Sequence, residues 1–343
     1  MSIPSTVRSA PIAVVTGGSS GIGRATALEF AEAGYDIALI ARGEEALLAA
    51  QAEVLQRGRR CLTLPCDVSD AAAVDAAAAR IEAELGPVAV WINNAAVTQV
   101  APFLETEPAE FERVMAVTYL GQVNGTRAAL RRMAPRNRGV IALVGSAVAY
   151  RGIPLQSAYS GAKFALRGFA EALRCELLHD GTRVTVVEVH PPSVNTPLYD
   201  NARGRHVGRP QPVRPVYQPE AVARAIRQAV EGEVREMWVG GATVGAAVGN
   251  MLAPALLDRV LARQGYRDQQ GGGADTVADN LDRPVGGRLA SHGRFDDEAR
   301  ATAVAVPADL LRVAAGAAFV GAAALTQGLG LVASLMARAV RRP

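Results

Sequence analysis

Residues 11–34 read PIAVVTGGSSGIGRATALEFAEAG, a short apolar run, then a glycine-rich turn, then a helical pattern. The run at 11–17 predicts a buried strand because it is β-branched and almost wholly apolar. The helix that follows ends at Gly34. Glycines at 17, 21 and 23 permit a tight turn, and the helix after them presents free N–H groups and its positive dipole end. The stretch therefore predicts a turn that holds a pyrophosphate, with Ile22 inside it.

Further short apolar runs alternate with helical patterns along the chain. The strands are predicted at 35–41, 61–68, 88–96, 139–146, 183–191 and 235–241. Near-continuous apolar strands that alternate with helices indicate a parallel sheet covered on both faces. With the first strand they make seven, so the fold class is α/β, a doubly wound parallel sheet with helices on both faces.

The end of the second strand bears on which nucleotide the turn holds. An acid usually stands there in NAD-binding sheets, but this chain has Ala41 followed by Arg42. Arg42 can pair with a 2′-phosphate, aided by the hydroxyls of Ser19 and Ser20. The alternative is that Arg42 is a solvated loop arginine. The mechanism favours NADP(H) over NAD(H).

Lys163 is the only lysine among the 36 lysine and arginine residues, and it stands four residues after Tyr159. On a predicted helix this spacing puts both side chains on one face. An adjacent ammonium can lower the pKa of a phenol, and it can also bond ribose hydroxyls. Ser146 lies at the carboxyl end of the fifth predicted strand, where ligands sit in such sheets. The three residues together predict acid–base catalysis.

These features resemble the short-chain dehydrogenase/reductase family over residues 10–241: the glycine turn, NNAA at 93–96, Ser146, the Tyr159–Lys163 pair and HPPSVNTP at 190–197. The resemblance implies a Rossmann-type fold and hydride transfer between NADP(H) and a carbonyl or secondary alcohol. It makes Tyr159 the general acid or base, Lys163 its electrostatic partner and ribose ligand, and Ser146 the donor that orients the substrate. Its further cofactor-binding residues are Asp67, Val68, Asn94, Val194 and Thr196.

Thr118 departs from the family pattern. It stands where many members carry a catalytic asparagine, so we expect a rearranged or slower proton relay. The substrate is not identified by the sequence. Residues 198–218 form the expected substrate loop. Its arginines fit an anionic or amphiphilic substrate, or acidic lipid headgroups, but the composition favours a solvated, mobile lid.

Beyond the domain predicted over 1–241, residues 242–266 indicate a helical extension with a break near Pro254. Residues 267–307 are polar and rich in glycine and aspartate, which predicts a linker, in part disordered. The segment 308–343 is predicted as a hydrophobic helix, and its uncharged stretch at 313–337 has the length to span a membrane. A helix that lies on the membrane surface, on the domain or in an oligomer interface fits as well.

The net charge of +3 and the absence of a basic stripe give no reason to expect a nucleic-acid partner. Cys61, Cys66 and Cys175 form no metal-binding pattern, so no metal is expected. No signal peptide is read at the N-terminus, which predicts a cytoplasmic protein, attached to the membrane if the C-terminal segment inserts. The resemblance adds a homodimer or homotetramer. The competing hypotheses are a non-catalytic nucleotide sensor and a membrane scaffold on the same fold.

Overall fold

The computed structural model describes residues 10–273, 278–286 and 290–313. The chain divides into two compact units, Met1–Ala305 and Val306–Pro343, and the first holds the sheet and the helices around it. The predicted hydrophobic stretch at 313–337 lies outside the described residues from residue 314 onward. Within the described ranges, no helix is both long enough and apolar enough to cross a membrane.

One large sheet organises the first unit, and its order confirms the predicted doubly wound α/β fold. The order is β12-β11-β7-β6-β4-β1-β2-β3, and each neighbouring pair from β11 to β3 is parallel. The strands are β1 (Ile12–Thr16), β2 (Asp36–Ala41), β3 (Cys61–Pro65), β4 (Val88–Asn93), β6 (Gly139–Val144), β7 (Val184–His190), β11 (Glu236–Val239) and β12 (Ala305–Pro307). The sheet has eight strands, whereas the sequence predicted seven. The eighth strand, β12, was missed because three residues are too few to show a strand pattern.

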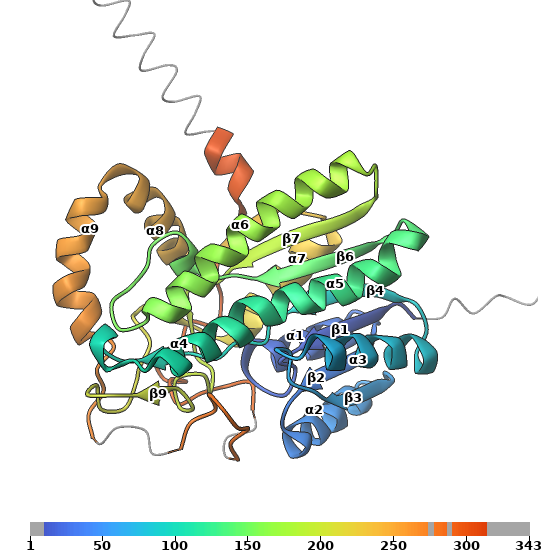
Figure 1. Cartoon of the computed structure of the whole chain (residues 1–343), viewed down its shortest axis with the longest axis horizontal. Helices are drawn as coiled ribbons and strands as arrows, with labels where there is room; N and C mark the ends of the chain where they lie inside the picture. The colour runs from blue at the N-terminus through green and yellow to red at the C-terminus, as the bar shows by residue number, and fades with distance from the viewer. Residues whose placement is uncertain (1–9, 274–277, 287–289, 314–343) are drawn as a thin grey trace, which may run out of the picture. The chain divides into compact units, whose positions relative to one another are not determined.

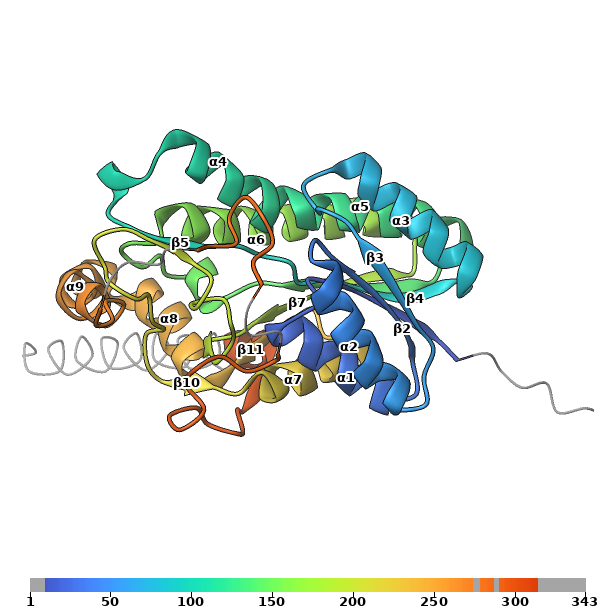
Figure 2. The same ribbon diagram turned by 90° about the horizontal axis from the view of Figure 1, so that it is seen from below.

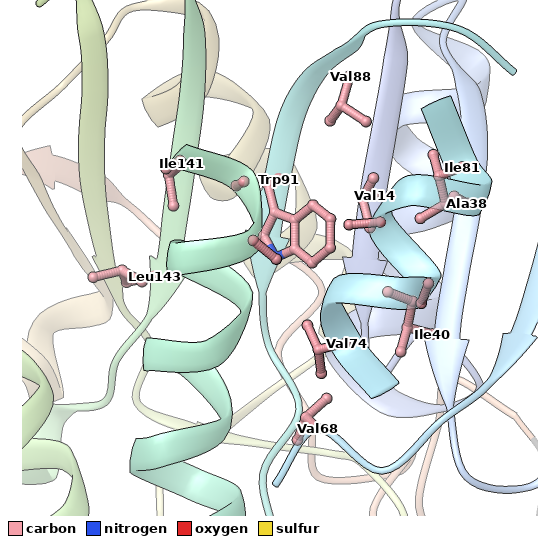
Figure 3. Close-up of a cluster of buried hydrophobic side chains, with 14 of the residues drawn as sticks. Val14, Ala38, Ile40, Val68, Val74, Ile81, Val88, Trp91, Ile141 and Leu143 are labelled. Atoms are coloured by element: carbon pink, nitrogen blue, oxygen red, sulfur yellow. The ribbon is translucent and has the colours of Figure 1, made fainter. Parts of the chain in front are cut away.

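Helices cover both faces of the sheet (Figure 2). One face carries α1 (Gly21–Glu32), α2 (Glu44–Gln56) and α7 (Pro219–Glu231); the other carries α3 (Ala71–Glu84), α4 (Pro108–Met115), α5 (Gly121–Met133) and α6 (Ser157–His179). A π-turn at Ala116–Leu120 joins α4 to α5. Figure 3 shows Trp91 of β4 among apolar side chains of the second face. Trp91 is fully buried, and its indole N–H donates to Asn93 Oδ1 at 3.0 Å, so the core satisfies its polar atom.

Short elements shape the edge where the strands end. Two small parallel pairs, β5 with β9 and β8 with β10, lie there. Their bounds are β5 (Gln99–Val100), β8 (Ser193–Val194), β9 (Arg203–Gly204) and β10 (Val216–Tyr217). Among the described residues, 3-10 turns at Phe103–Glu105 and Ala147–Ala149 follow β5 and β6, and another at Ala134–Arg136 precedes β6. Because each strand has two residues, no periodicity in the sequence predicts them.

The extension belongs to the same unit as the sheet. It forms α8 (Gly240–Leu252) and α9 (Pro254–Val260), separated at Ala253, and then a π-turn at Leu261–Gly265 (Figure 1). The described residues of the polar segment predicted as a linker lie against the sheet domain: Leu281 is fully buried, and the Arg300 carbonyl accepts from Gln218 N–H at 2.9 Å. Gln218 and Arg300 are far apart in the sequence, so local composition does not reveal this contact.

Candidate active site

A cavity of about 470 Å³ brings together almost all of the residues singled out from the sequence. Its lining includes the glycine turn, the loops after β2, β3, β4 and β6, and the first turns of α6. The predicted residues found in the lining are Gly17, Ser19, Ser20, Gly21, Ile22, Arg42, Asp67, Val68, Asn94, Ser146, Tyr159, Lys163, Val194 and Thr196. Gly23 and Thr118 do not line it.

The glycine turn has the backbone that the sequence predicted. Gly17 and Gly21 have φ of +66° and +56°, a region that side chains rarely adopt. A Cβ on Gly23 would lie 2.2 Å from the Gly17 carbonyl oxygen, so Gly23 lets the first turn of α1 pack on the loop. Asn94 Nδ2 donates to the Thr16 carbonyl at 3.0 Å, so its amide braces the turn from β4. Gly17 and Gly21 line the cavity where α1 begins, and the backbone N–H groups of a helix start can bind a pyrophosphate.

Ser146, Tyr159 and Lys163 meet on the β6–α6 side of the cavity. The Lys163 ammonium donates to the Val144 carbonyl at 2.7 Å and lies 5.5 Å from the centroid of the Tyr159 ring. Ser146 Oγ accepts from the Val148 N–H at 3.3 Å, and the Ser146 and Tyr159 side chains share a hydrogen bond. The three functional groups therefore point at one region, in which a substrate oxygen can be placed.

The charges in this group differ from those of the sequence argument. We expected the ammonium to lower the pKa of the phenol, but burial raises the pKa of Tyr159 above its usual value, and the hydrogen bond with Ser146 offsets this only in part. Burial also lowers the pKa of Lys163 to about 7. Removal of both groups from water outweighs their mutual attraction in the free protein, because each loses its hydration.

The buried ammonium gives the protein an unusual dependence of stability on pH. Between about pH 7 and its unfolded value of 10.5, Lys163 binds a proton in the unfolded chain and not in the folded one. The free energy of unfolding therefore rises with pH across this window. Relative to Lys163→Met, whose side chain does not titrate, we expect the wild-type protein to gain several kcal/mol, because the free energy changes by about 1.4 kcal/mol for each pH unit crossed.

Urea unfolding of both proteins at half-unit steps from pH 7 to 10 measures that gain. Parallel stability curves for the two proteins would contradict a depressed pKa for Lys163.

Thr118 lies in the π-turn and is fully buried. Its hydroxyl donates to the Val97 carbonyl at 2.8 Å and accepts from the Val97 N–H at 3.1 Å. Thr118 thus holds the loop after β4, of which Val97 lines the cavity. The threonine side chain acts on the site through Val97, and a role in a proton relay stays a prediction.

Thr118→Val keeps the shape of the side chain and leaves both polar groups of Val97 without this partner. We expect a loss of about 1–3 kcal/mol in the free energy of unfolding, the cost of buried unpaired groups. Thr243→Val is the matched control, because the Thr243 hydroxyl is also buried but donates only to the Val239 carbonyl at the start of α8, at 2.7 Å. Equal losses in urea unfolding of the two variants would contradict the bracing role of Thr118.

Arg42 is half-buried, and its guanidinium donates to the Leu281 carbonyl at 3.3 Å and to the Asn280 carbonyl. It is not a solvated loop arginine. Burial lowers the pKa of Arg42, and the charge of Arg113 adds to this, while Asp67 and Asp282 work in the other direction. Arg42 lines the cavity, and a guanidinium group there can pair with an anionic ligand.

The opposite end of the cavity contains residues that the sequence reasoning missed. Tyr199, whose pKa burial raises to about 12, lies close enough to Tyr159 to raise its pKa. Arg151 lines the cavity and holds the extension, with Nη1 donating to Asn250 Oδ1 at 3.0 Å and Nη2 pairing with Asp258. The extension adds small and apolar lining residues: Ala242, Gly245, Ala246, Leu257 and Leu261. The small residues at 242–249 were the available signal, but such a stretch also fits ordinary helix packing.

The arginines of the predicted substrate loop are mostly paired with acids. Arg203 and Arg205 both contact Glu110, and Arg209 pairs with Asp200. Arg214 pairs with Glu298 and also lines the cavity. The pairing removes most of the positive charge that suggested an anionic substrate.

The chain is similar to a family of known proteins. The family model described as short chain dehydrogenase matches residues 11–206. The uncharacterized oxidoreductase YxnA of Bacillus subtilis is 35% identical over 260 residues, which are 75% of this chain and 73% of that protein. The 3-ketodihydrosphingosine reductase of Bos taurus is 36% identical over 228 residues, 64% of this chain and 68% of that protein.

Solved structures agree in fold. A short-chain dehydrogenase from Streptomyces avermitilis matches with a TM-score of 0.64 at 28% identity, over 76% of this chain and 99% of that one. An alcohol dehydrogenase from the archaeon Thermococcus sibiricus, complexed with 5-hydroxy-NADP, matches with 0.59 at 27% identity, over 66% and 95%. An NAD⁺-bound xylitol dehydrogenase matches with 0.52 at 28% identity, over 55% and 72%.

Proposed function

This chain belongs to the short-chain dehydrogenase family, and from that premise we propose that it reduces a carbonyl of a hydrophobic or amphiphilic substrate, or oxidises the matching secondary alcohol, with NADP(H). One observation carries the proposal. Ser146, Tyr159 and Lys163 line the same cavity as the glycine turn, so a proton donor and a pyrophosphate cradle serve one bound pair of ligands.

The cradle fits a dinucleotide because Gly17 and Gly21 line the cavity at the start of α1, where backbone N–H groups would bind the pyrophosphate. When bound, the cofactor supplies or accepts the hydride at the carbonyl carbon. Tyr159 gives its phenolic proton to the carbonyl oxygen, and the Ser146 hydroxyl stabilises the charge that builds there. Lys163 would hold the ribose hydroxyls and stabilise the phenolate that remains. In oxidation, the phenolate of Tyr159 would take the proton from the alcohol oxygen.

The preference for NADP(H) over NAD(H) is part of the proposal. Its support is Ala41 at the end of β2, where an acid would repel a phosphate, and the guanidinium of Arg42 in the cavity lining. The similar structures include both an NADP complex and an NAD⁺ complex, so likeness does not choose between them. The ratio of kcat/KM for NADPH and NADH, measured in the wild type and Arg42→Gln, tests the preference: an unchanged ratio contradicts it.

The substrate class follows from the walls of the cavity. Besides the reacting groups, the lining contains Val148 and Ile153 and the small and apolar residues of α8 and α9, which present apolar surface. Such a wall favours an aliphatic chain on the substrate. A similar protein, the 3-ketodihydrosphingosine reductase of Bos taurus, is named for a keto substrate, which agrees with a carbonyl substrate for this chain.

A panel of carbonyl compounds of increasing chain length tests the function. NADPH oxidation is followed with the purified full chain, from propanal and acetone to medium- and long-chain ketones in mixed micelles. We expect kcat/KM to rise with chain length, because each buried methylene adds about 0.8 kcal/mol. Turnover that is flat across the series contradicts the apolar substrate, and no turnover with any member contradicts the reductase.

A homodimer or homotetramer, and membrane attachment through 313–337, stay predictions from the sequence. Light scattering of the purified chain measures the oligomeric state; a monomer at micromolar concentration contradicts the homo-oligomer.

Partitioning of the full-length and tail-deleted proteins between detergent and aqueous phases tests the membrane attachment, and identical partitioning of the two proteins contradicts it.

A further inference from the structure

Residues 278–286, here called the strap, come from the segment predicted as a linker and lie at the adenosine end of the cavity. Four of them line it: Asn280, Pro284, Val285 and Gly286. The family resemblance gives Asp67 and Val68 of that end to the adenine. We propose that the strap is the outer wall of the adenosine subsite and retains the cofactor. The proposal rests on the nicotinamide cofactor of the proposed function and adds an element outside the family model, which ends at residue 206.

Two arginines of the sheet domain bind the strap through its backbone. Leu281 O accepts from Arg113 Nε at 2.9 Å and from Arg42 Nη1 at 3.3 Å, and Asn280 O accepts from Arg42 Nη2. Arg113 also bonds Ser69 Oγ at 2.8 Å and pairs with Asp67. A guanidinium has five N–H donors, so Arg42 can keep these two bonds and still donate to a phosphate. The strap carbonyls thereby fix the orientation of Arg42 at the cavity rim.

Side chains of the strap add a second set of anchors. The Asp279 carboxylate pairs with Arg203 Nε at 2.8 Å, and the Asp282 carboxylate pairs with Arg203 Nη2 at 2.8 Å. Arg203 in turn pairs with Glu110 at 2.9 Å, a carboxylate that is only 6% exposed. Leu281 is fully buried in the apolar cluster that contains Val68. An apolar anchor between two aspartates that share one arginine holds this short segment in one place.

The position of the strap indicates that it lines the adenosine subsite and does not occupy the place of the cofactor. The cavity stays open between the strap and the glycine turn, since residues of both line it. Pro284 lies beside Gly43: a Cβ added to Gly43 would be 3.5 Å from the Cβ of Pro284, an ordinary van der Waals contact. Further along, the Ala290 carbonyl accepts from the Gly21 N–H at 3.1 Å, a donor at the start of α1 that a pyrophosphate can also use. The experiment must therefore distinguish a strap that retains the cofactor from one that competes with the cofactor for the site.

Two variants of the full chain loosen the strap without touching the glycine turn: Leu281→Ala, and Asp279→Ala combined with Asp282→Ala. Binding is measured for NADPH, for 2′,5′-ADP as the adenosine half and for reduced nicotinamide mononucleotide as the other half. We expect the Kd of NADPH and of 2′,5′-ADP to rise on the order of tenfold, mostly through faster release, because a loose strap leaves fewer molecules in the retaining state. The Kd of the mononucleotide should not change.

Asp75→Ala is the matched control, because Asp75 pairs with Arg131 and Arg132 on the α3–α5 surface, away from the cavity. It should bind all three probes like the wild type, and melting curves show whether each variant is folded. Unchanged Kd values in both strap variants overturn the proposal, and tighter binding overturns it in favour of a competitor. A strap effect without carbonyl turnover overturns the reductase alone. A wild-type chain that binds none of the nucleotides overturns both.

Discussion

Tyr159→Phe is expected to lower kcat for carbonyl reduction by about 10²–10⁴-fold, the range that a positioned general acid contributes. The substitution removes one oxygen from a half-buried ring and keeps the contact between that ring and the Lys163 ammonium. Ser146 cannot replace the phenol as proton donor, because an aliphatic hydroxyl is a far weaker acid; its O–H would only stabilise the charge on the substrate oxygen. NADPH oxidation at saturating NADPH, with the most active ketone of the panel, measures the loss.

The companion measurement is the Kd of NADPH for the same variant, which should stay within about threefold of the wild type because no cofactor-binding cradle changes. Tyr199→Phe is a matched control: its phenol is also removed from water and lines the same cavity, but its hydroxyl hydrogen-bonds Ser193, and the one lysine of the chain lies beside Tyr159. If Tyr159→Phe kept its turnover, or if both variants lost the same amount, the acid–base role of Tyr159 would be excluded.

Gly23→Ala is expected to have the second large effect, on cofactor binding and on folding together. The new Cβ would lie 2.2 Å from the Gly17 carbonyl oxygen and 2.5 Å from Asn94 Nδ2, so the helix start and the turn must move apart. Overpacking of this kind costs about 1–3 kcal/mol of stability. It also spoils the backbone positions that a pyrophosphate needs, so we expect the Kd of NADPH to rise at least about 100-fold, or roughly 3 kcal/mol.

Gly168→Ala is the control for this change. Gly168 lies inside α6, where an added Cβ meets nothing within 4 Å, so alanine should raise the free energy of unfolding by about 0.5–1 kcal/mol through helix propensity. Calorimetric melting and NADPH titration of both variants give the comparison. A Gly23→Ala protein that binds NADPH like the wild type would show that the close approach of α1 to the turn does not matter.

The sequence alone determined the fold class, because each run of apolar residues is a local pattern with a strand or helix period. It also predicted the glycine turn and the proposed catalytic group: the glycines, Ser146, Tyr159 and Lys163 stand out by type and spacing, and a parallel sheet brings strand ends to one edge. The residues predicted from those patterns line one cavity, with Gly23 and Thr118 behind its wall.

The tertiary structure decided what depends on contacts distant in sequence. The pKa shifts of Tyr159 and Lys163 follow from burial, which their spacing does not contain. Thr118 acts on the site through Val97, 21 positions away. The strap depends on bonds from Arg42 and Arg113 to carbonyls 239 and 168 residues downstream, in a segment whose polar composition resembles that of a linker. Backbone carbonyls are the same in every residue, so no sequence pattern marks those that an arginine will bind.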